Sequence, residues 1–401
     1  MEEIARVGVL GAGTMGSGIA QVATQAGLHV LIHDPVDGAV GRALERIGGF
    51  LHRKAEKGEL STEDAALALA RIEEVHDAEA LTAADLVVEA IPEDLELKLD
   101  AFRRLDAAAP PETILATNTS SLPIARIAAA TQRPGRVLGM HFFNPVPLMA
   151  LVEVVVGPMT EPAVVDAIAL TARRMGKTPV IAADTPGFIV NRVARPFYLE
   201  PLRILGERLA GVETIDEALR GVGFKMGPFE LIDAIGADVN LAVSESVFEQ
   251  FFHDPRYRPH PIQRMLVDAG RLGRKAGGGF YEYAEDGERG AAWAPIARRP
   301  GGPARLTLSG DQIAGRVIAL LVNEAASAVA EAVATAEAID IAMRLGTNYP
   351  SGPLEWGERI GLANVVRTLD GLHAAVPDGR YRVVPMLRSM AERKASFFES
   401  R

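Results

Sequence analysis

The hydrophobic pattern of the first half of the chain alternates between short apolar runs and longer amphipathic segments. Short apolar runs bounded by turn residues predict buried strands, and segments with helical periodicity predict helices. Strands that alternate with helices in this way predict a doubly wound α/β sheet of the Rossmann type. The predicted strands are 5–10, 28–33, 85–90, 113–117 and 136–140, and the predicted helices are 17–26, 40–57, 93–108 and 123–130.

Beyond residue 184 the apolar positions follow a helical period. Residues 188–209 predict one long helical segment, a second is expected to begin at Ile215 after an N-cap at Thr214, and a third is expected to begin at 227–233. Residues 284–303 are rich in Gly, Ala, Arg and Pro, which indicates a linker.

After this linker the helical pattern repeats. Glu200 aligns with Glu324, whereas Asn191 falls on Gly315, so the second copy is expected to be structural. The alternative is two helical bundles with coincidental Gly-Pro turns. We predict domains at 1–183, 184–283 and 309–401, with a linker at 284–308. The matching segments are Ile215-Asp216, Ala218 and Arg220 with Ile339-Asp340, Ala342 and Arg344, and Gly227-Pro228-Phe229-Glu230 and Ile235-Gly236 with Gly352-Pro353-Leu354-Glu355 and Ile360-Gly361.

A glycine-rich turn, Gly11-Ala12-Gly13-Thr14-Met15-Gly16, separates the first predicted strand from the first helix. Gly11 permits the tight turn, Gly13 lets the backbone approach a pyrophosphate, and Gly16 allows close packing of helix and strand. The next strand ends at Asp34, which would accept hydrogen bonds from a ribose hydroxyl and repel a 2′-phosphate. The order strand, turn, helix, strand and acid therefore predicts an NAD site.

Composition narrows the class of protein. The 401 residues are 48% hydrophobic and 23% charged, as in a globular protein of two or three domains. A net charge of −10 argues against a nucleic-acid partner. With no cysteine, and no metal-ligand spacing among the eight histidines, we expect neither disulfides nor a metal site. We expect no apolar run near the roughly 18 residues of a membrane span, no signal peptide, no membrane partner and a cytoplasmic location.

Several polar residues in the first half are candidates for chemistry. His141 follows an apolar run and precedes Asn144-Pro145, and is either a core histidine or a base beside a substrate. Residues 118–121, Asn-Thr-Ser-Ser, follow a predicted strand and either cap a helix or contact a ligand. The basic cluster Arg53, Lys54 and Lys57 is either a solvated face or a phosphate contact.

The sequence around these candidates resembles the L-3-hydroxyacyl-CoA dehydrogenases from the first strand to about Tyr283, and the gulonate dehydrogenases look similar. The resemblance implies a reversible hydride transfer between NAD and C3 of a hydroxyacyl-CoA thioester. The blocks that carry it are Gly-Ala-Gly-Thr-Met-Gly at 11–16, Val-Glu-Ala-Ile-Pro-Glu at 88–93, Asn-Thr-Ser-Ser-Leu at 118–122, His-Phe-Phe-Asn-Pro-Val-Pro at 141–147, Leu-Val-Glu-Val at 151–154 and Asp-Thr-Pro-Gly-Phe-Ile-Val-Asn-Arg at 184–192.

The resemblance also implies roles for single residues. His141 would be the general base, and Glu153, in the apolar run 151–156, would orient it, unless Glu153 points outward from an edge strand. Asn191 and Ser120 would act on the reacting part of the substrate, Asn144 would hold the local site, and Lys54 would contact the CoA phosphates. The implied cofactor contacts are Gly11, Gly13, Thr14, Met15, Gly16, Asp34, Glu93, Lys98 and Asn118.

These expectations lead to one main hypothesis and two alternatives. The main hypothesis is oxidation of a 3-hydroxyacyl-CoA in fatty-acid β-oxidation, butanoate or phenylacetate-type catabolism, with 3-hydroxyadipyl-CoA among the substrates considered. The alternatives are a gulonate-type sugar-acid dehydrogenase and a non-catalytic NAD-binding structural protein. The two helical copies are expected to pack as an intramolecular pseudo-dimer, and a homodimer of the whole chain is a further candidate assembly.

Overall fold

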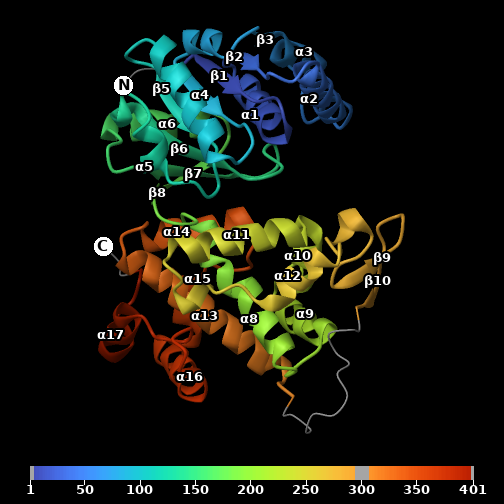
Figure 1. Cartoon of the computed structure of the whole chain (residues 1–401), viewed down its shortest axis with the longest axis vertical. Helices are drawn as coiled ribbons and strands as arrows, with labels where there is room; N and C mark the ends of the chain where they lie inside the picture. The colour runs from blue at the N-terminus through green and yellow to red at the C-terminus, as the bar shows by residue number, and fades with distance from the viewer. Residues whose placement is uncertain (1–3, 294–306, 399–401) are drawn as a thin grey trace. The chain divides into compact units, whose positions relative to one another are not determined.

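The computed structural model describes residues 4–293 and 307–398. The chain forms two compact units, Met1–Phe188 and Ile189–Arg401, and each is described by itself (Figure 1). The first unit is an α/β sheet domain and the second consists mainly of helices.

The first unit contains an eight-stranded sheet with the order β3-β2-β1-β4-β5-β6-β7-β8. Neighbouring strands are parallel except β6 and β7. The predicted α/β architecture is confirmed, and the ends of the nine predicted elements lie within three residues of those observed. The strands are β1 Arg6–Leu10, β2 His29–His33, β3 Ile72–Glu74, β4 Leu86–Glu89, β5 Ile114–Thr117, β6 Val137–Phe142, β7 Leu151–Val156 and β8 Thr178–Ala183.

Helices cover both faces of this sheet, as buried apolar residues require on a doubly wound fold. Helices α1, α2, α3 and α6 pack on one face through a core that includes Val9, Ile19 and Ile168. Helices α4 and α5 pack on the other face around Phe102. The helices are α1 Thr14–Gln25, α2 Ala39–Glu56, α3 Thr62–Ala70, η1 Glu79–Ala83, α4 Leu95–Ala108, α5 Ile124–Ala128, η2 Pro134–Arg136 and α6 Pro162–Arg174.

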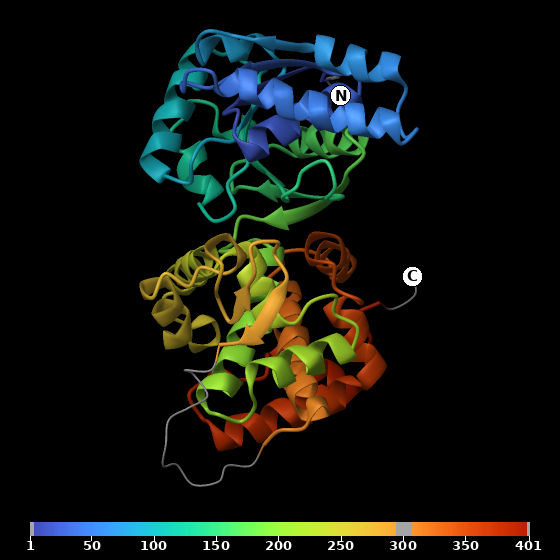
Figure 2. The same ribbon diagram turned by 90° about the vertical axis from the view of Figure 1, so that its right-hand side faces the viewer.

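The second unit is built around α13, which lies between helices of both sequence copies (Figures 1 and 2). The predicted segment 188–209 is divided at Ala194 into α7 and α8, and α9 begins at Val212 with Gly211 as its N-cap. The expected cap at Thr214 is therefore wrong. The helices are α7 Val190–Val193, α8 Arg195–Gly206, α9 Val212–Gly221, α10 Pro228–Ile235, α11 Ala237–Gln250, η3 Pro255–Tyr257, α12 Pro261–Asp268, η4 Arg274–Ala276, α13 Gly310–Ala330, α14 Ala336–Thr347, α15 Pro353–Ile360, α16 Leu362–Ala375 and α17 Pro385–Arg393.

The repeat seen in the sequence has a structural counterpart. Asp216 accepts hydrogen bonds from the backbone N–H groups of Phe229 and Glu230 at the start of α10. Asp340 accepts the same pair of bonds from Leu354 and Glu355 at the start of α15. Each aspartate therefore caps the following helix of its own copy, so the two copies share one local fold.

The predicted linker is not free of regular structure. Within 284–308, Arg289–Ala292 form strand β10, which pairs with β9, Tyr281–Tyr283, in an antiparallel hairpin. Residues 294–306 of this segment lie outside the described part of the chain. The three predicted boundaries, after residues 183, 283 and 308, stay predictions.

We predicted that no segment has the length and composition of a membrane span, but helix α13 has both. Its 21 residues include an 18-residue window with a mean hydropathy of 1.5, and 83% of that window is buried inside the structure. A core helix of a globular protein meets the same test, because it is apolar on every side that contacts protein. In the structure α13 contacts α8, α9, α15 and α16.

Candidate active site and cofactor cleft

Strands β6 and β7 bring His141 and Glu153 together. The antiparallel register places the two residues directly opposite each other, and His141 Nδ1 lies 2.7 Å from Glu153 Oε2. Glu153 is fully buried, and His141 keeps 5% of its surface exposed. Because β7 lies between β6 and β8, Glu153 does not sit on an edge strand, and the outward-facing interpretation is wrong. The carboxylate selects the tautomer with a proton on Nδ1, which leaves a lone pair on Nε2.

Two aromatic rings hold the imidazole on its other sides. The ring centroid of Phe143 lies 4.5 Å from that of His141, and the ring of Phe188 lies 5.8 Å away in an edge contact. Within residues 4–293 and 307–398, no hydrogen bond joins His141 Nε2 to another protein atom. The arrangement therefore fixes one ring nitrogen and leaves the other able to exchange a proton with a ligand.

Glu93 gathers the polar residues that follow β5. Its Oε1 accepts hydrogen bonds from Thr119 Oγ1 at 2.6 Å, from the Ser120 N–H at 2.9 Å and from Ser121 Oγ at 3.0 Å. Burial alone would raise the pKa of Glu93, but the Lys98 ammonium and these hydrogen bonds lower it. Glu93 therefore stays ionised and fixes the loop that carries Ser120.

Lys98 and Asn118 stabilise the strand ends beside this loop. The Lys98 ammonium is buried and donates to Glu89 Oε1, while burial raises the pKa of Glu89. Asn118 Oδ1 accepts a hydrogen bond from the Phe142 N–H at 2.8 Å, next to His141. Both side chains are held by protein contacts, and their predicted contact with the cofactor stays a prediction.

The glycine-rich turn has the geometry that a dinucleotide needs. Gly11 has φ +103°, a conformation that side chains rarely adopt, and a Cβ on Gly16 would lie 1.8 Å from the Gly11 carbonyl oxygen. A Cβ on Gly13 would meet no atom within 4 Å, so the backbone there faces open space. A pyrophosphate can approach this turn at the N-terminus of α1.

A cleft of about 950 Å³ adjoins this turn. Asp34 lines it, accepting the Ala12 N–H on Oδ2 at 2.7 Å and the Val36 N–H on Oδ1 at 2.9 Å. The cleft has the size, the open glycine backbone and the carboxylate that an NAD molecule requires. Of the predicted cofactor contacts, Gly11, Gly13, Thr14, Met15 and Asp34 line it, whereas Gly16, Glu93, Lys98 and Asn118 do not.

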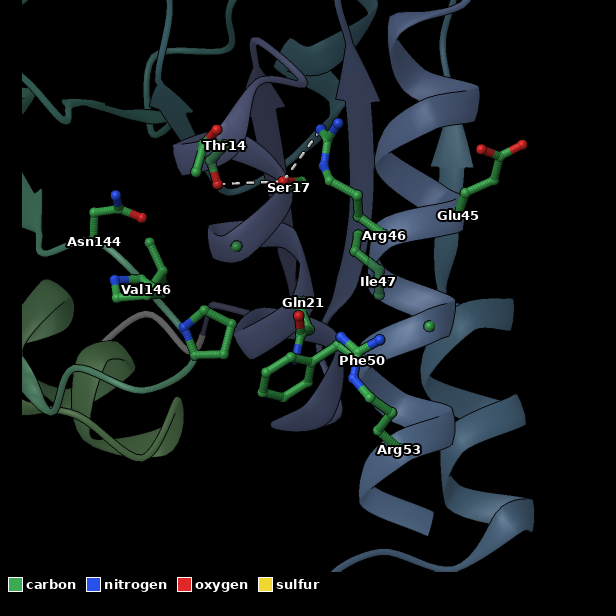
Figure 3. A pocket seen from close by; sticks show the side chains of 14 residues that line it. Thr14, Ser17, Gln21, Glu45, Arg46, Ile47, Phe50, Arg53, Asn144 and Val146 are labelled. Carbon is green, nitrogen blue, oxygen red and sulfur yellow. Dashed lines mark hydrogen bonds between the residues drawn. The ribbon is translucent and has the colours of Figure 1, made fainter. Parts of the chain in front are cut away.

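A second cavity, of about 350 Å³, lies between α1, α2 and the loop after β6 (Figure 3). Asn144 lines it from the loop, and Arg46, Phe50 and Arg53 line it from α2. Arg46 and Phe50 were missed by the sequence analysis, although their spacing with Arg53 places all three on one helical face. Lys54 does not line the cavity, and its ammonium lies 5.7 Å from the centroid of the Phe50 ring.

Lys177 is a further residue of this region, and no sequence pattern marks it. Its buried ammonium donates to the carbonyl oxygens of Val146 and, at 2.8 Å, of Met149. Burial, and to a lesser degree the charge of Lys54, lower its pKa to about 8. Lys177 thereby fixes the loop that begins at Asn144.

Asn191 lies in the second unit, in the short helix α7, and is partly buried. Its carbonyl oxygen accepts a hydrogen bond from Arg195 Nε at 2.8 Å. The other predicted substrate and catalytic residues, which are His141, Glu153, Ser120, Asn144 and Lys54, belong to the first unit.

Comparison with known protein families accounts for both units. Residues 6–185 match the model of the 3-hydroxyacyl-CoA dehydrogenase NAD-binding domain. Residues 187–283 and 313–396 each match the C-terminal domain of the same family. The chain belongs to the 3-hydroxyacyl-CoA dehydrogenase family. Members of this family are NAD-dependent oxidoreductases, and the protein is such an enzyme.

Individual 3-hydroxyacyl-CoA dehydrogenases are similar over different lengths. The 3-hydroxyadipyl-CoA dehydrogenase of Escherichia coli (strain K12) is 38% identical, with 98% of each chain covered. A probable 3-hydroxybutyryl-CoA dehydrogenase of Bacillus subtilis is 46% identical over 71% of this chain and 99% of its own. The crystal structure of 3-hydroxybutyryl-CoA dehydrogenase from Escherichia coli K12 has a TM-score of 0.91 at 38% identity and covers 98% of this chain and 99% of its own.

Proposed function

We propose that this enzyme oxidises an L-3-hydroxyacyl-CoA to the 3-ketoacyl-CoA with His141 as general base. The observation that supports this role is the buried His141–Glu153 pair, which occurs in an NAD-binding fold. A buried carboxylate next to a histidine both selects the tautomer and stabilises the imidazolium that forms when the ring accepts a proton.

Bound NAD supplies the acceptor for the hydride that leaves C3 of the substrate. His141 Nε2 takes the proton of the C3 hydroxyl group, and the C3–O bond becomes a carbonyl. The imidazolium is stabilised by the charge of Glu153. In the reverse direction the same nitrogen returns the proton, so one residue serves as base and acid.

The remaining contacts of the site are part of this proposal. Ser120 and Asn191 would donate hydrogen bonds to the reacting portion of the substrate, and Asn144 would hold the wall beside it. Lys54, with Arg46 and Arg53 on the same helix, would bind the CoA phosphates. The proposed cofactor contacts are Gly11, Gly13, Thr14, Met15, Gly16, Asp34, Glu93, Lys98 and Asn118.

We also propose that the second helical copy takes the place of a second subunit. Glu200 accepts hydrogen bonds from Arg316 Nε at 2.9 Å and from Tyr381 Oη at 2.8 Å. Glu324 accepts one from Arg192 Nε at 2.7 Å and another from Tyr257 Oη. The two sets correspond residue by residue at an offset of 124 positions: Arg192 with Arg316, Glu200 with Glu324, and Tyr257 with Tyr381. Such reciprocal contacts are typical of a twofold interface, which supports an intramolecular pseudo-dimer.

The acyl group is the remaining part of the proposal. Two relatives that cover 98% of this chain are named for 3-hydroxyadipyl-CoA and for 3-hydroxybutyryl-CoA, and a shorter relative is also named for 3-hydroxybutyryl-CoA. We propose that the substrate is a short- or medium-chain 3-hydroxyacyl-CoA, with the dicarboxylic adipyl form included. Catabolism of fatty acids, butanoate or phenylacetate, in the cytoplasm, is the proposed setting.

Oxidation of NADH with a set of 3-ketoacyl-CoAs tests this function. We expect turnover with acetoacetyl-CoA, 3-oxoadipyl-CoA or a longer 3-ketoacyl-CoA, and a loss of about 100-fold or more in kcat for His141→Gln. The NADH affinity of this variant, measured by fluorescence titration, should equal that of the wild type. Activity on a sugar acid without activity on any acyl-CoA, or full turnover by His141→Gln, would contradict the proposal.

A further inference from the structure

Arg195, at the start of α8, is a buried cation without a carboxylate partner. Only 3% of its surface is exposed, and it makes no ion pair within residues 4–293 and 307–398. Its hydrogen bonds go to neutral acceptors, the Asn191 carbonyl oxygen at 2.8 Å and Ser244 Oγ at 3.2 Å. Burying a charge is costly unless it is paired. By contrast, Arg192 of copy 1 and Arg316 of copy 2 are also buried, and each pairs with a glutamate.

Two tyrosines, Tyr198 and Tyr349, also interact electrostatically with the Arg195 guanidinium. Its Cζ lies 4.8 Å from the centroid of the Tyr198 ring. Burial raises the pKa values of Tyr198 and Tyr349, so both hydroxyl groups keep their protons, and Arg195 acts electrostatically on both. Tyr349 is 5% exposed and its hydroxyl group has no hydrogen-bond partner in the described residues. A buried cation that no carboxylate of the described residues pairs with, together with two protonated tyrosine hydroxyl groups able to donate, is suited to bind an anion.

The second copy shows that the helical scaffold does not require these polar groups. The positions of Arg195 and Tyr198 correspond, 124 residues later, to Ala319 and Val322. From the Gly-Pro turns at 227 and 352 through α11 and α16 the offset between the copies is 125, and at this offset Ser244 corresponds to Leu369. Copy 2 therefore fills the same place with apolar side chains, as an ordinary helix core does.

The remaining donor comes from the second copy. Tyr349 corresponds to Phe224 of copy 1, and the two rings meet in an edge contact with centroids 4.9 Å apart. The two residues thus face each other across the interface between the copies. Only Tyr349 carries a hydroxyl group, and that group lies in the electrostatic field of Arg195. Copy 2 thereby completes a polar cluster that belongs to copy 1.

The position of this cluster relates it to the proposed substrate site. Arg195 follows Asn191 by four residues, and its Nε donates to the Asn191 carbonyl oxygen at 2.8 Å, so the two residues are direct neighbours. In a 3-hydroxyadipyl group the second carboxylate is separated from C3 by only two methylene groups. A substrate whose C3 oxygen is bound by Asn191 would therefore carry its distal carboxylate within reach of the next turn.

We propose that Arg195, Tyr198 and Tyr349 form a subsite for the distal carboxylate of a dicarboxylic 3-hydroxyacyl-CoA. The guanidinium supplies the charge, and the two tyrosine hydroxyl groups donate hydrogen bonds to the carboxylate. The subsite rests on the proposed function, and it assigns to the second helical copy a contribution to substrate recognition through Tyr349.

The test compares kcat/KM for 3-oxoadipyl-CoA and acetoacetyl-CoA in four variants. Arg195→Ala, which installs the residue of copy 2, should lower the adipyl-to-acetyl ratio by about 100-fold. Arg195→Lys should lower it by less, and Tyr349→Phe by about 10-fold, because one neutral hydrogen bond is removed. Arg388→Ala, which removes an exposed arginine paired with Asp370, is the control and should leave the ratio unchanged.

Stability separates this role from a structural one. Removal of an unpaired buried charge should leave the Tm of Arg195→Ala equal to or above that of the wild type. An equal loss of activity with both substrates, together with a lower Tm, would overturn the subsite. An unchanged adipyl-to-acetyl ratio in Tyr349→Phe would also overturn the subsite. If Arg195→Ala does not fold, an unchanged ratio in Arg195→Lys would overturn it instead. Wild-type activity on acetoacetyl-CoA alone would overturn only the subsite, whereas no activity on any acyl-CoA would overturn the proposed function.

Discussion

Glu153 combines complete burial with a close contact to His141, which the register of two strands places opposite it. Its carboxylate faces the His141 imidazole at 2.7 Å in the interior of the sheet. At this depth an ionised carboxylate needs a donor, and the histidine supplies it. We infer that Glu153 acts through His141 and has no direct part in binding the cofactor.

At the level of single residues, we predict that Glu153→Gln lowers kcat by about 100-fold or more, because glutamine can accept the Nδ1 hydrogen bond but cannot stabilise an imidazolium. NADH affinity should be nearly unchanged. Steady-state kinetics and NADH titration measure the two quantities, with the exposed Glu63→Gln as control. A comparable loss of NADH affinity would show that the assigned role is wrong.

At the level of elements, α12 of the second unit depends on a cap that is itself partly buried. His260 caps α12, and its Nδ1 accepts the Ile262 N–H at 3.3 Å. A Cβ on Gly206 of α8 would lie 2.6 Å from the imidazole, so the ring packs closely on that helix. Burial and the charges of Arg203 and Arg380 lower the pKa of His260 to about 4. The neutral ring is therefore the form that stabilises this part of the fold.

This shift predicts a pH dependence of stability. Below pH 6.5 the unfolded chain binds a proton on His260, whereas the folded chain does not until about pH 4, so the free energy of unfolding falls over that window as the pH falls. Between pH 7.5 and 5.5 the loss should be about 1 kcal/mol. Urea denaturation of the wild type and His260→Gln measures it.

His260→Gln should lack the part of the pH dependence of unfolding free energy that comes from His260. The titration of other groups should affect both proteins equally. Equal pH slopes for wild type and His260→Gln would contradict the role given to the neutral imidazole.

At the level of the whole molecule, we propose that the chain carries a twofold interface within itself. Arg192 and Glu200 of copy 1 correspond to Arg316 and Glu324 of copy 2, and each arginine pairs with the glutamate of the other copy. The interface is therefore self-complementary: two identical first copies could form the same pairs. Only copy 1 retains the asparagine at position 191, so we expect one active site per chain.

Deletion after Gly302 tests this arrangement. The shortened chain would expose the buried faces of α8 that contact α13, and Arg192 would lose Glu324. We expect it to self-associate, because a second molecule can supply Glu200 in place of Glu324. Analytical ultracentrifugation of both proteins measures the change. A shortened chain that stays folded in the same association state as the full-length protein would rule out the pseudo-dimer.

The sequence alone determined the architecture of the first unit, the glycine turn with Asp34, and the existence of a helical repeat. These features depend on local patterns: apolar periodicity, residues suited to positive φ, and aligned identities at a fixed offset. The helix start at Val212 and the strand at 289–292 were not predicted, since no strong cap or alternation marks them.

Only the tertiary structure decided which side chains meet. His141 and Glu153 are twelve residues apart in sequence, and it is the antiparallel register of β6 and β7 that places them opposite each other. Arg195 has the sequence context of an ordinary helical residue, and its lack of an anionic partner becomes visible only when Tyr198, Ser244 and Tyr349 surround it. Periodicity specifies which residues are buried, whereas register and packing between distant segments specify their partners, and charge chemistry depends on the partner.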